Sequence, residues 1–222
     1  ITFMPKPYFG AAGSGMHFHQ FLVKGGKNVF YDAKGYANLS ETALYYVGGI
    51  LDHAAALCAL TNPSTNSFKR LAPGFEAPTS CFFGKGDRNA AVRAPKYATD
   101  PGEVRVEYRT PDGTCNPYLA IPAMLLAGLD GIARKVDPRT NGYGPFDDDV
   151  LAWPEEKQKQ IRKVPFSLNE ALVALEKDHD FLTDSGVFSK DFINFWVKVL
   201  RKEATDILTR PIPIEIERYL DC

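Results

Sequence analysis

Two histidines one residue apart, His17 and His19, are the side chains of this 222-residue chain that are best placed to bind a metal ion or a phosphate group. They follow a glycine-rich segment, residues 10–15, and begin an apolar run that is typical of a strand. Alternate side chains of a strand share a face, so both imidazoles should point the same way. A neutral imidazole is also common as an ordinary core or surface group. The pair alone therefore leaves metal binding, phosphate binding and a purely structural role open.

A second predicted strand, residues 104–110, alternates between apolar and charged side chains. Arg105, Glu107 and Arg109 fall on one face, and two valines and a tyrosine fall on the other. A solvated sheet face would explain the charged stripe equally well. If this strand lies next to His17, however, one imidazole and one carboxylate come together between arginines. Such a pair suits Mg²⁺ or Mn²⁺ shared with the phosphates of a substrate.

Residues 62–78 separate these two strands and contain three prolines, a glycine and several small polar side chains. This composition predicts an ordered loop with no continuous helix. A loop of this length in a compact domain more often carries functional residues than serves only as a connection. It carries Arg70, and the segment after it carries Arg88 and Arg93. Arginine favours bidentate recognition of carboxylates and phosphates, although scattered solvated charges would give the same composition.

Five motifs follow one another in a specific order and spacing. They are Phe3-Met4-Pro5-Lys6-Pro7, Gly13-Ser14-Gly15-Met16-His17-x-His19, Asn62-Pro63-x-x-Asn66-Ser67-Phe68-Lys69-Arg70-Leu71-x-Pro73-Gly74-Phe75-Glu76-Ala77-Pro78, Arg88-x-x-x-x-Arg93 and Arg105-x-Glu107-x-Arg109-x-Pro111-Asp112. Together they closely resemble glutamine synthetase, and more specifically the C-terminal catalytic domain of its bacterial long-chain class. The resemblance runs from Ile1 to the segment 211–220. It implies that the amino-terminal domain and several catalytic glutamates of full-length relatives are absent from this chain.

The resemblance implies an ATP-dependent ligase. In glutamine synthetases ATP phosphorylates the γ-carboxylate of L-glutamate, and ammonia then displaces phosphate from γ-glutamyl phosphate to give glutamine. This chemistry depends on cations and preorganised arginines more than on a nucleophilic side chain. The expected cofactor is Mg²⁺ or Mn²⁺, with ATP as co-substrate. We expect the 222-residue chain alone to be inactive, because the acids that hold the other metal ion lie outside it.

The resemblance also implies a role for each predicted site residue. His17 and Glu107 would hold one divalent ion, His19, Arg93 and Arg105 would contact ATP, and Arg88 would contact the transferring phosphoryl group. Gly13, Arg70 and Arg109 would bind glutamate. Glu76 resembles a flap glutamate that shields the acyl phosphate from water and helps deprotonate ammonium.

Three positions depart from the family pattern. Ala12 stands where bacterial relatives usually carry an asparagine that touches glutamate, Phe21 stands in place of a serine that meets ATP, and Gly102 in place of a nucleotide-contacting lysine. Two other functions therefore stay open. One is a γ-glutamyl ligase that uses an amine other than ammonia, and the other is a non-catalytic structural or regulatory relative.

Composition narrows the partners and the location. Lys and Arg number 26 against 27 Asp and Glu, and this near-neutral balance argues against nucleic-acid binding. The four cysteines form no C-x-x-C motif, so neither a disulfide framework nor a zinc site is predicted. The apolar segment 117–134 is interrupted by Pro122 and Asp130, so no membrane span is expected. We expect a cytoplasmic protein without a signal peptide.

The predicted fold is α+β, with a curved, mainly antiparallel sheet that carries the site and helices packed on its other side. Helices are expected to start after Ser40, at Asn116-Pro117, at a Ser167–Glu170 capping box and after Ser189. We expect a catalytic core over residues 1–140 and a helical C-terminal region over 141–222. The alternation of residues 210–217 predicts an edge strand at its end. The resemblance further implies a homo-oligomer, a double ring in full-length relatives.

Overall fold

The computed structural model describes residues 1–75 and 77–221 of the chain. Its strands are β1 (Phe18–Gln20), β2 (Val23–Lys24), β3 (Lys27–Asn28), β4 (Ser80–Lys85), β5 (Ala90–Ala94) and β6 (Val106–Tyr108). Its α-helices are α1 (Glu41–Asp52), α2 (Ala54–Thr61), α3 (Thr65–Arg70), α4 (Pro117–Arg134), α5 (Glu155–Gln158), α6 (Leu168–Lys177), α7 (Asp180–Thr183), α8 (Lys190–Leu208) and α9 (Pro213–Tyr219). Short 3₁₀ helices cover Tyr36–Asn38 and Val150–Ala152.

The sheet has the strand order β1-β6-β5-β4. β6 pairs with β1 and with β5 in the antiparallel sense, whereas β4 and β5 run parallel, so the sheet is mixed. The strands β2 and β3 form a separate hairpin. The predicted α+β fold with a mainly antiparallel sheet is therefore confirmed, with one parallel pair at the β4 edge.

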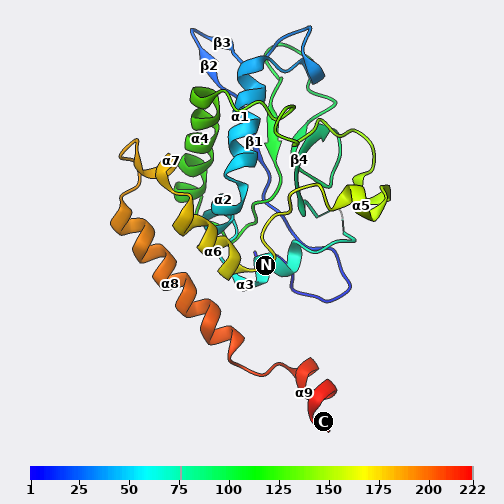
Figure 1. Ribbon diagram of the computed structural model, residues 1–222, viewed down its shortest axis with the longest axis vertical. Helices are drawn as coiled ribbons and strands as arrows, with labels where there is room; N and C mark the ends of the chain where they lie inside the picture. The colour runs from blue at the N-terminus through cyan, green and yellow to red at the C-terminus, as the bar shows by residue number, and fades with distance from the viewer. Residues whose placement is uncertain (76, 222) are drawn as a thin grey trace.

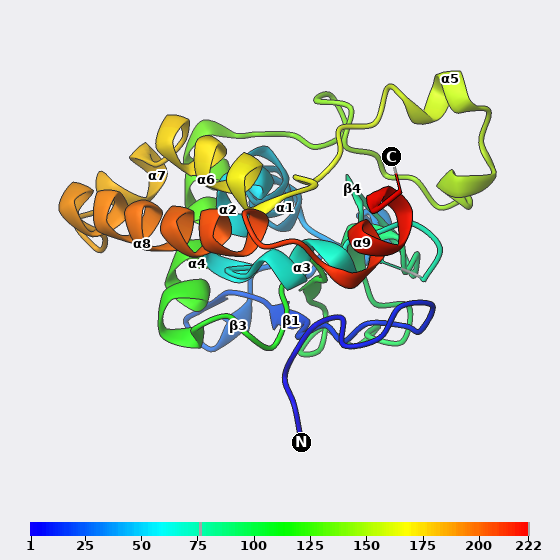
Figure 2. The same cartoon turned by 90° about the horizontal axis from the view of Figure 1, so that it is seen from below.

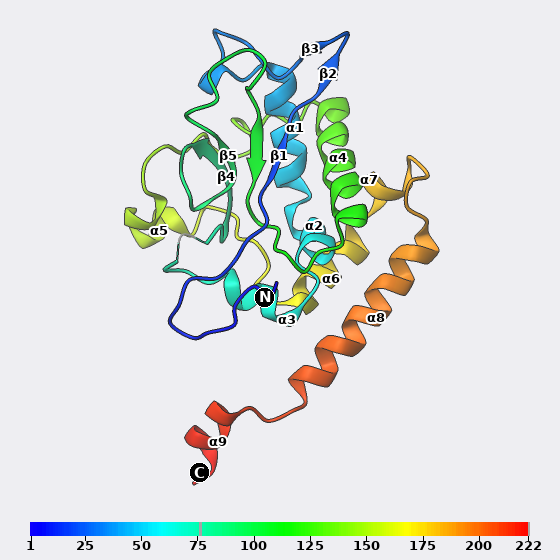
Figure 3. The ribbon, with the colours of Figure 1, turned by 180° about the vertical axis from the view of Figure 1, so that it is seen from behind.

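Helices α1, α2 and α4 cover one face of the sheet, and Figure 3 shows β1 from the opposite side with these helices behind it. α1 and α4 approach closely through glycines, because a Cβ added at Gly131 would lie only 2.5 Å from the Cα of Gly49. Val92, Val106 and Tyr108 of the sheet belong to the same buried cluster as these helices. The side chains that alternate with these along β5 and β6 point to the opposite face of the sheet, and that face carries the site.

The helical layer continues outward in α6 and α8 (Figure 1). Ser40, Asn116, Ser167 and Ser189 cap α1, α4, α6 and α8 as predicted. The capping box at Ser167 is only half formed, because the Glu170 carboxylate accepts the backbone N–H of Phe166. On α8 the buried stripe is Ile193, Val197, Leu200 and Ala204, whereas Phe195 and Val199 are exposed.

The helix that starts after Ser40, as expected, is broken at His53, and the chain continues in α2 at an angle of 73° to α1. Cys58 is fully buried in α2. Within the described ranges no single helix has the length and apolar character needed to cross a bilayer, and only the bent α1–α2 pair meets those criteria jointly. Nearly all of α2 is buried inside the protein core.

Two further expectations about secondary structure are wrong. The stretch 62–78 contains the short helix α3, because Ser64 and Ser67 form a capping box between the prolines. The tail 210–217 is not an edge strand but leads into α9, with Pro213 in the first helical turn. Figure 2 shows α8 running beside α6, and Figures 1 and 3 show α9 at the far end of the molecule, away from the sheet. The domain boundary near residue 140 stays a prediction.

Candidate active site

Three predicted site residues lie side by side on the sheet face that points away from α1 and α4. The register of β1 and β6 places His19 opposite Glu107, and the register of β5 and β6 places Arg93 opposite Glu107. Residues that are directly opposite in a sheet share a face. The expected neighbourhood of the two strands is therefore confirmed, and Glu107 lies at the centre of the row.

Glu107 is held by three cationic or potentially cationic groups. Its Oε1 lies 2.9 Å from Nδ1 of His17 and 2.9 Å from Nη1 of Arg109, and its Oε2 lies 2.6 Å from Nε and from Nη2 of Arg93. The residue is 1 % exposed. The charged stripe of β6 is therefore no solvated sheet face, since its carboxylate is enclosed by ion pairs.

Charge around Glu107 strongly favours its ionised form. Burial opposes ionisation, but the contact with His17 and the positive charges of Arg109 and Arg93 lower the pKa of Glu107 to about 2. Burial also lowers the pKa of the Arg109 guanidinium, against the raising effect of Glu107. Two arginines around one carboxylate leave this part of the face with a surplus of positive charge.

His19 and Arg105 form the outer end of the same face. Nε of Arg105 donates to Nδ1 of His19 over 3.3 Å, and its Nη1 donates to the Glu103 carbonyl over 2.9 Å. The guanidinium also lies 5.3 Å from the ring centroid of Tyr97. Burial, the largest influence, lowers the pKa of His19, so the neutral imidazole that accepts from Arg105 is favoured. These contacts bring together two of the residues predicted to meet ATP.

Arg70 reaches the site from the end of α3 and is fixed by backbone carbonyls. Its Nη1 donates to Thr110 over 2.6 Å and to Pro111 over 3.1 Å, and its Nη2 donates to Arg109 over 3.0 Å. Burial lowers the pKa of Arg70 to about 10, which still leaves it charged near neutral pH. Backbone carbonyls thus fix the plane of the guanidinium, and none of these three hydrogen bonds involves a carboxylate.

The glycine-rich segment packs directly on Arg70. A Cβ at Gly13 would lie 2.8 Å from Cγ of Arg70, and one at Gly15 would collide with Nη2 of Arg70 and approach Nε2 of His17. The backbone can approach the guanidinium this closely only because these two positions lack a side chain. Gly13 and Gly15 therefore form one wall of the site.

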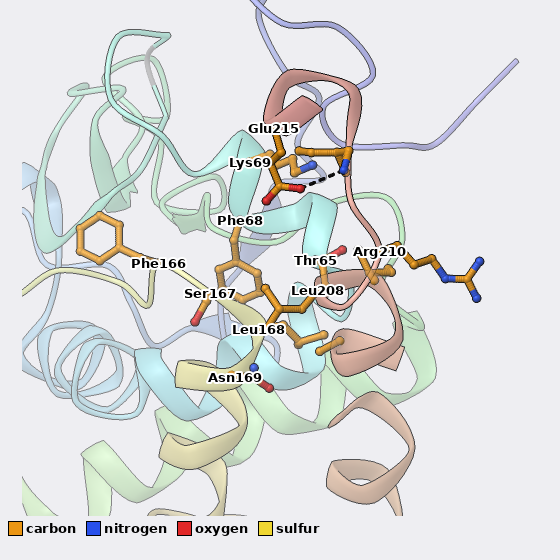
Figure 4. A pocket seen from close by; sticks show the side chains of 13 residues that line it. Thr65, Phe68, Lys69, Phe166, Ser167, Leu168, Asn169, Leu208, Arg210 and Glu215 are labelled. Atoms are coloured by element: carbon orange, nitrogen blue, oxygen red, sulfur yellow. Dashed lines mark hydrogen bonds between the residues drawn. The ribbon is translucent and has the colours of Figure 1, made fainter. Parts of the chain in front are cut away.

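A cavity of about 210 Å³ opens between these elements. It is lined by Ala12, Gly13, Gly15, His17, Arg70, Phe75, Ala77 and Arg109. The predicted residue Glu76 lies outside the described residues. A larger cavity of about 340 Å³ lies between α3, α6 and the α8–α9 connection (Figure 4). Among the described residues, none of those predicted for the site lines that second cavity.

Arg88 lies on the connection between β4 and β5, and it is joined to the site through its backbone. Its carbonyl accepts Nε of Arg109 over 3.2 Å. The structure thus places His17, His19, Arg70, Arg93, Arg105, Glu107 and Arg109 around one face, with Gly13 beside them and Arg88 at its border. A concave, cation-rich site of this kind is suited to bind phosphates and carboxylates.

Comparisons with known proteins agree with this chemistry. The family model for the glutamine synthetase catalytic domain matches residues 1–219. The chain belongs to the glutamine synthetase family. It is 50% identical over its full length to a glutamine synthetase of Microchaete diplosiphon and 46% identical to one of Mycobacterium tuberculosis, and it covers 46% of each of those proteins.

Solved structures give the same result. The fold matches a Plasmodium falciparum glutamine synthetase with a TM-score of 0.83 and 31% identity, over 98% of this chain and 49% of that one. It matches a GmaS/ADP complex with a TM-score of 0.84 and 34% identity, over the whole of this chain and 49% of that one. The resemblance to the catalytic domain of glutamine synthetase is confirmed, and the chain spans about half the length of the relatives it matches.

The glutamine synthetase family implies use of a divalent metal, and His17 and Glu107 fit one side of such a site. Imidazole nitrogen and carboxylate oxygen are both ligands for Mn²⁺ and Mg²⁺. Within residues 1–75 and 77–221, no group of three or more His, Cys, Asp or Glu side chains is placed to hold a metal ion. Among these described residues, His17 and Glu107 are the two predicted metal ligands, and the structure brings them into contact.

Some site residues of this glutamine synthetase domain had no role assigned from the sequence. Phe75 and Ala77 line the cavity, and Asn62 connects the loops beneath it by donating to the Thr110 carbonyl over 2.8 Å and to Asp112 over 3.0 Å. Phe75, Ala77 and Asn62 all belong to the motifs that carry the resemblance. Their place in those motifs could have identified them as site residues from the sequence, but their residue types alone indicate no chemistry.

Proposed function

We propose that this chain supplies the nucleotide- and glutamate-binding half of an enzyme that joins ammonia to L-glutamate, with ATP hydrolysed to ADP and phosphate. The proposal follows the two-step route in which ATP phosphorylates the γ-carboxylate and ammonia displaces the phosphate. It is supported most directly by the buried Glu107, which is surrounded by His17, Arg93 and Arg109 at the edge of a cavity. Glutamate–ammonia ligase activity of the full-length protein is the conclusion we draw.

The charge distribution fits the demands of phosphoryl transfer. The transition state carries charge on its equatorial oxygens, and preorganised cations stabilise it without reorganising. Glu107 holds Arg93 and Arg109 in place, since both guanidiniums point at its two oxygens. His17 and Glu107 would hold Mg²⁺ or Mn²⁺, which supplies further positive charge to the phosphates when bound.

The remaining residues bind and orient the substrates. We assign His19, Arg93 and Arg105 to the nucleotide and Arg88 to the transferring phosphoryl group. Arg70, Arg109 and the backbone at Gly13 are assigned to glutamate. Arg70 is well prepared for this role, because three carbonyls fix its plane before a substrate carboxylate arrives. Glu76 is assigned to ammonium deprotonation and to exclusion of water.

The test is glutamine formation by the purified full-length protein from glutamate, ammonia and ATP, with Mg²⁺ and Mn²⁺ compared. We expect glutamine and ADP in equal amounts, and no product without a divalent ion. The 222-residue chain alone should give no glutamine, because His17 and Glu107 are the only metal ligands that we assign within residues 1–75 and 77–221. A full-length protein that binds neither ATP nor Mn²⁺ by calorimetry would instead support a non-catalytic relative.

A second candidate is ligation of another amine, and it is favoured by one observation. Ala12 lines the cavity with a methyl group and offers no side-chain hydrogen bond there. Assays with ammonia, hydroxylamine, methylamine and polyamines side by side separate the two candidates. We expect ammonia to give the highest kcat/KM, and a higher value for another amine would replace the proposed substrate. We further propose a cytoplasmic homo-oligomer, which sedimentation and cell fractionation would check.

A further inference from the structure

Lys6 connects two segments that both line the candidate active site. Its Nζ donates to the carbonyl of Ala11 in the glycine-rich segment, and the same Nζ lies 3.8 Å from the ring centroid of Phe75. Ala12 and Gly13, which follow Ala11, line the cavity, and Phe75 lines it as well. Lys6 itself does not line the cavity, but its ammonium group contacts both of these segments.

The backbone of Lys6 is anchored, which gives this link a fixed base. The Lys6 N–H donates to Oδ1 of Asn66 over 2.7 Å, and Nδ2 of Asn66 donates back to the Lys6 carbonyl over 3.0 Å. Asn66 belongs to α3, the helix that ends with Arg70. On the other side, the N–H of Ser14 donates to the Pro5 carbonyl over 2.8 Å and closes the loop between them.

We propose that Lys6 is a positioning residue that latches the glycine-rich wall to the Phe75 wall and thereby keeps water away from the reacting atoms. The two contacts at Nζ, one hydrogen bond and one cation–π contact, are each weak enough to break and re-form. Because both contacts are made by one ammonium group, losing that group releases both walls together. The catalytic consequence of the latch rests on the proposed function, whereas the latch itself does not.

Water exclusion matters for a γ-glutamyl phosphate. If water reaches it, a water oxygen takes the place of the ammonia nitrogen, the phosphate leaves, and the products are glutamate and inorganic phosphate. ATP is then consumed without amide formation. An unlatched site should therefore show a ratio of phosphate released to glutamine formed that exceeds one.

The first experiment measures this ratio in the full-length enzyme for Lys6→Met, Lys6→Arg and the matched control Lys202→Met on the exposed side of α8. The loss of one cation–π contact and one hydrogen bond shifts an opening equilibrium by roughly tenfold, so excess phosphate should rise by about that factor in Lys6→Met. Lys6→Arg should restore coupling, because a guanidinium also donates and stacks on aromatic rings. Lys202→Met should match the unsubstituted enzyme. Equal ratios in all four proteins would overturn the proposal.

The second experiment needs no activity and separates the two contacts. Amide hydrogen exchange is followed in residues 10–15, in 72–75 and in α1, which reports on global folding. Lys6→Met should speed exchange in both loop segments and leave α1 unchanged. In a Phe75→Leu background, Lys6→Met should still affect residues 10–15 but no longer affect residues 72–75.

The two experiments distinguish the two hypotheses. If the enzyme forms no glutamine but the exchange pattern is as expected, the proposed function fails and the latch stands. If glutamine forms and Lys6→Met leaves exchange in both loop segments unchanged, the latch is wrong and the proposed function stands.

Discussion

The molecule contains two histidine–carboxylate clusters of similar geometry and opposite surroundings. In the active-site cluster, Nδ1 of His17 lies 2.9 Å from Glu107, and the remaining partners of Glu107 are arginines. In the second cluster, Nδ1 of His53 lies 2.8 Å from Asp178, and Nε2 lies 2.8 Å from Asp130. The first cluster has cations in surplus, whereas the second has carboxylates in surplus.

This second cluster lies where α1 breaks into α2, and it joins that break to α4 and to the end of α6. The imidazole of His53 is also stacked on Phe181, with the ring centroids 3.9 Å apart. Arg134 pairs with Asp52 and Asp130, which completes the charges around the cluster. This group borders a cavity of about 440 Å³, and its imidazole is paired with two carboxylates, which favours a structural role. The surplus of arginines at the first cluster instead suits an anionic ligand.

Glu107→Gln in the full-length enzyme should have the largest effect of the variants we consider. The neutral amide has nearly the shape of the carboxylate, but it cannot hold Arg93 and Arg109 by charge or serve as an anionic metal ligand. We expect kcat to fall by about 10²–10³-fold, the range for loss of a preorganised electrostatic group, with the fold retained by circular dichroism. Glu156→Gln on the exposed helix α5 is the control. Activity within tenfold of the unsubstituted enzyme would show that this cluster is not catalytic.

The active-site cluster was largely predictable, because its signals are local. The alternation of residues 104–110 assigns Arg105, Glu107 and Arg109 to one face, and the histidines lie on a segment short enough to be read as one strand. The register that brings His19 opposite Glu107 was not predictable, since strand pairing depends on the whole sheet. The second cluster gave no local signal, because the partners of His53 lie 77 and 125 residues further along the chain.

The errors in secondary structure have a similar origin. In residues 62–78 the prolines exclude a long helix, but they leave room for α3 because Ser64 and Ser67 cap it. In the tail, Ile212, Ile214 and Ile216 alternate as in a strand. No sheet edge pairs with them in the structure of residues 1–75 and 77–221, and Glu215 accepts the N–H of Ile212 over 2.9 Å to start α9 instead. Periodicity predicts the element only where tertiary partners agree with it.

His53→Gln should affect stability and leave catalysis unchanged. Loss of the imidazolium leaves Asp178 and Asp130 without their shared cation, and removing one member of a buried pair is costly. The side chains of Asp130 and Asp178 are 25% and 40% exposed, which reduces the expected loss in the free energy of unfolding to about 1–2 kcal/mol. Urea unfolding of the full-length protein measures this loss. The two variants should therefore differ in kind: Glu107→Gln lowers kcat, and His53→Gln lowers stability. A large fall in kcat for His53→Gln with an unchanged urea midpoint would contradict this difference between the clusters.

The smallest effect, and the one that separates the clusters most directly, is the pH dependence of stability. Burial lowers the pKa of His53, but hydrogen bonds and charge from Asp178 and Asp130 outweigh it and raise the pKa above 6.5. The folded state then binds this proton more tightly than the unfolded state. Its stabilisation is complete below about pH 6.5 and is lost as the pH rises through the folded value, with a slope of at most about 1.4 kcal/mol per pH unit. Glu107 has the opposite sign, because its pKa is lowered from 4.5 to about 2, so its stabilisation is present above pH 4.5 and is lost as the pH falls.

Urea midpoints measured from pH 3 to pH 9 on the full-length protein and on both variants test these opposite signs. His53→Gln should flatten the decline on the alkaline side only, and Glu107→Gln should flatten the decline on the acidic side only. Nδ1 of His53 faces Asp178, and Nε2 faces both Asp130 and, over 3.2 Å, Nη2 of Arg134. An unchanged alkaline decline in His53→Gln would mean that the ring is neutral in the folded protein, with Nε2 accepting from Arg134. In that case the second cluster would be an ordinary hydrogen-bonded histidine, and only the active-site cluster would owe its geometry to charge.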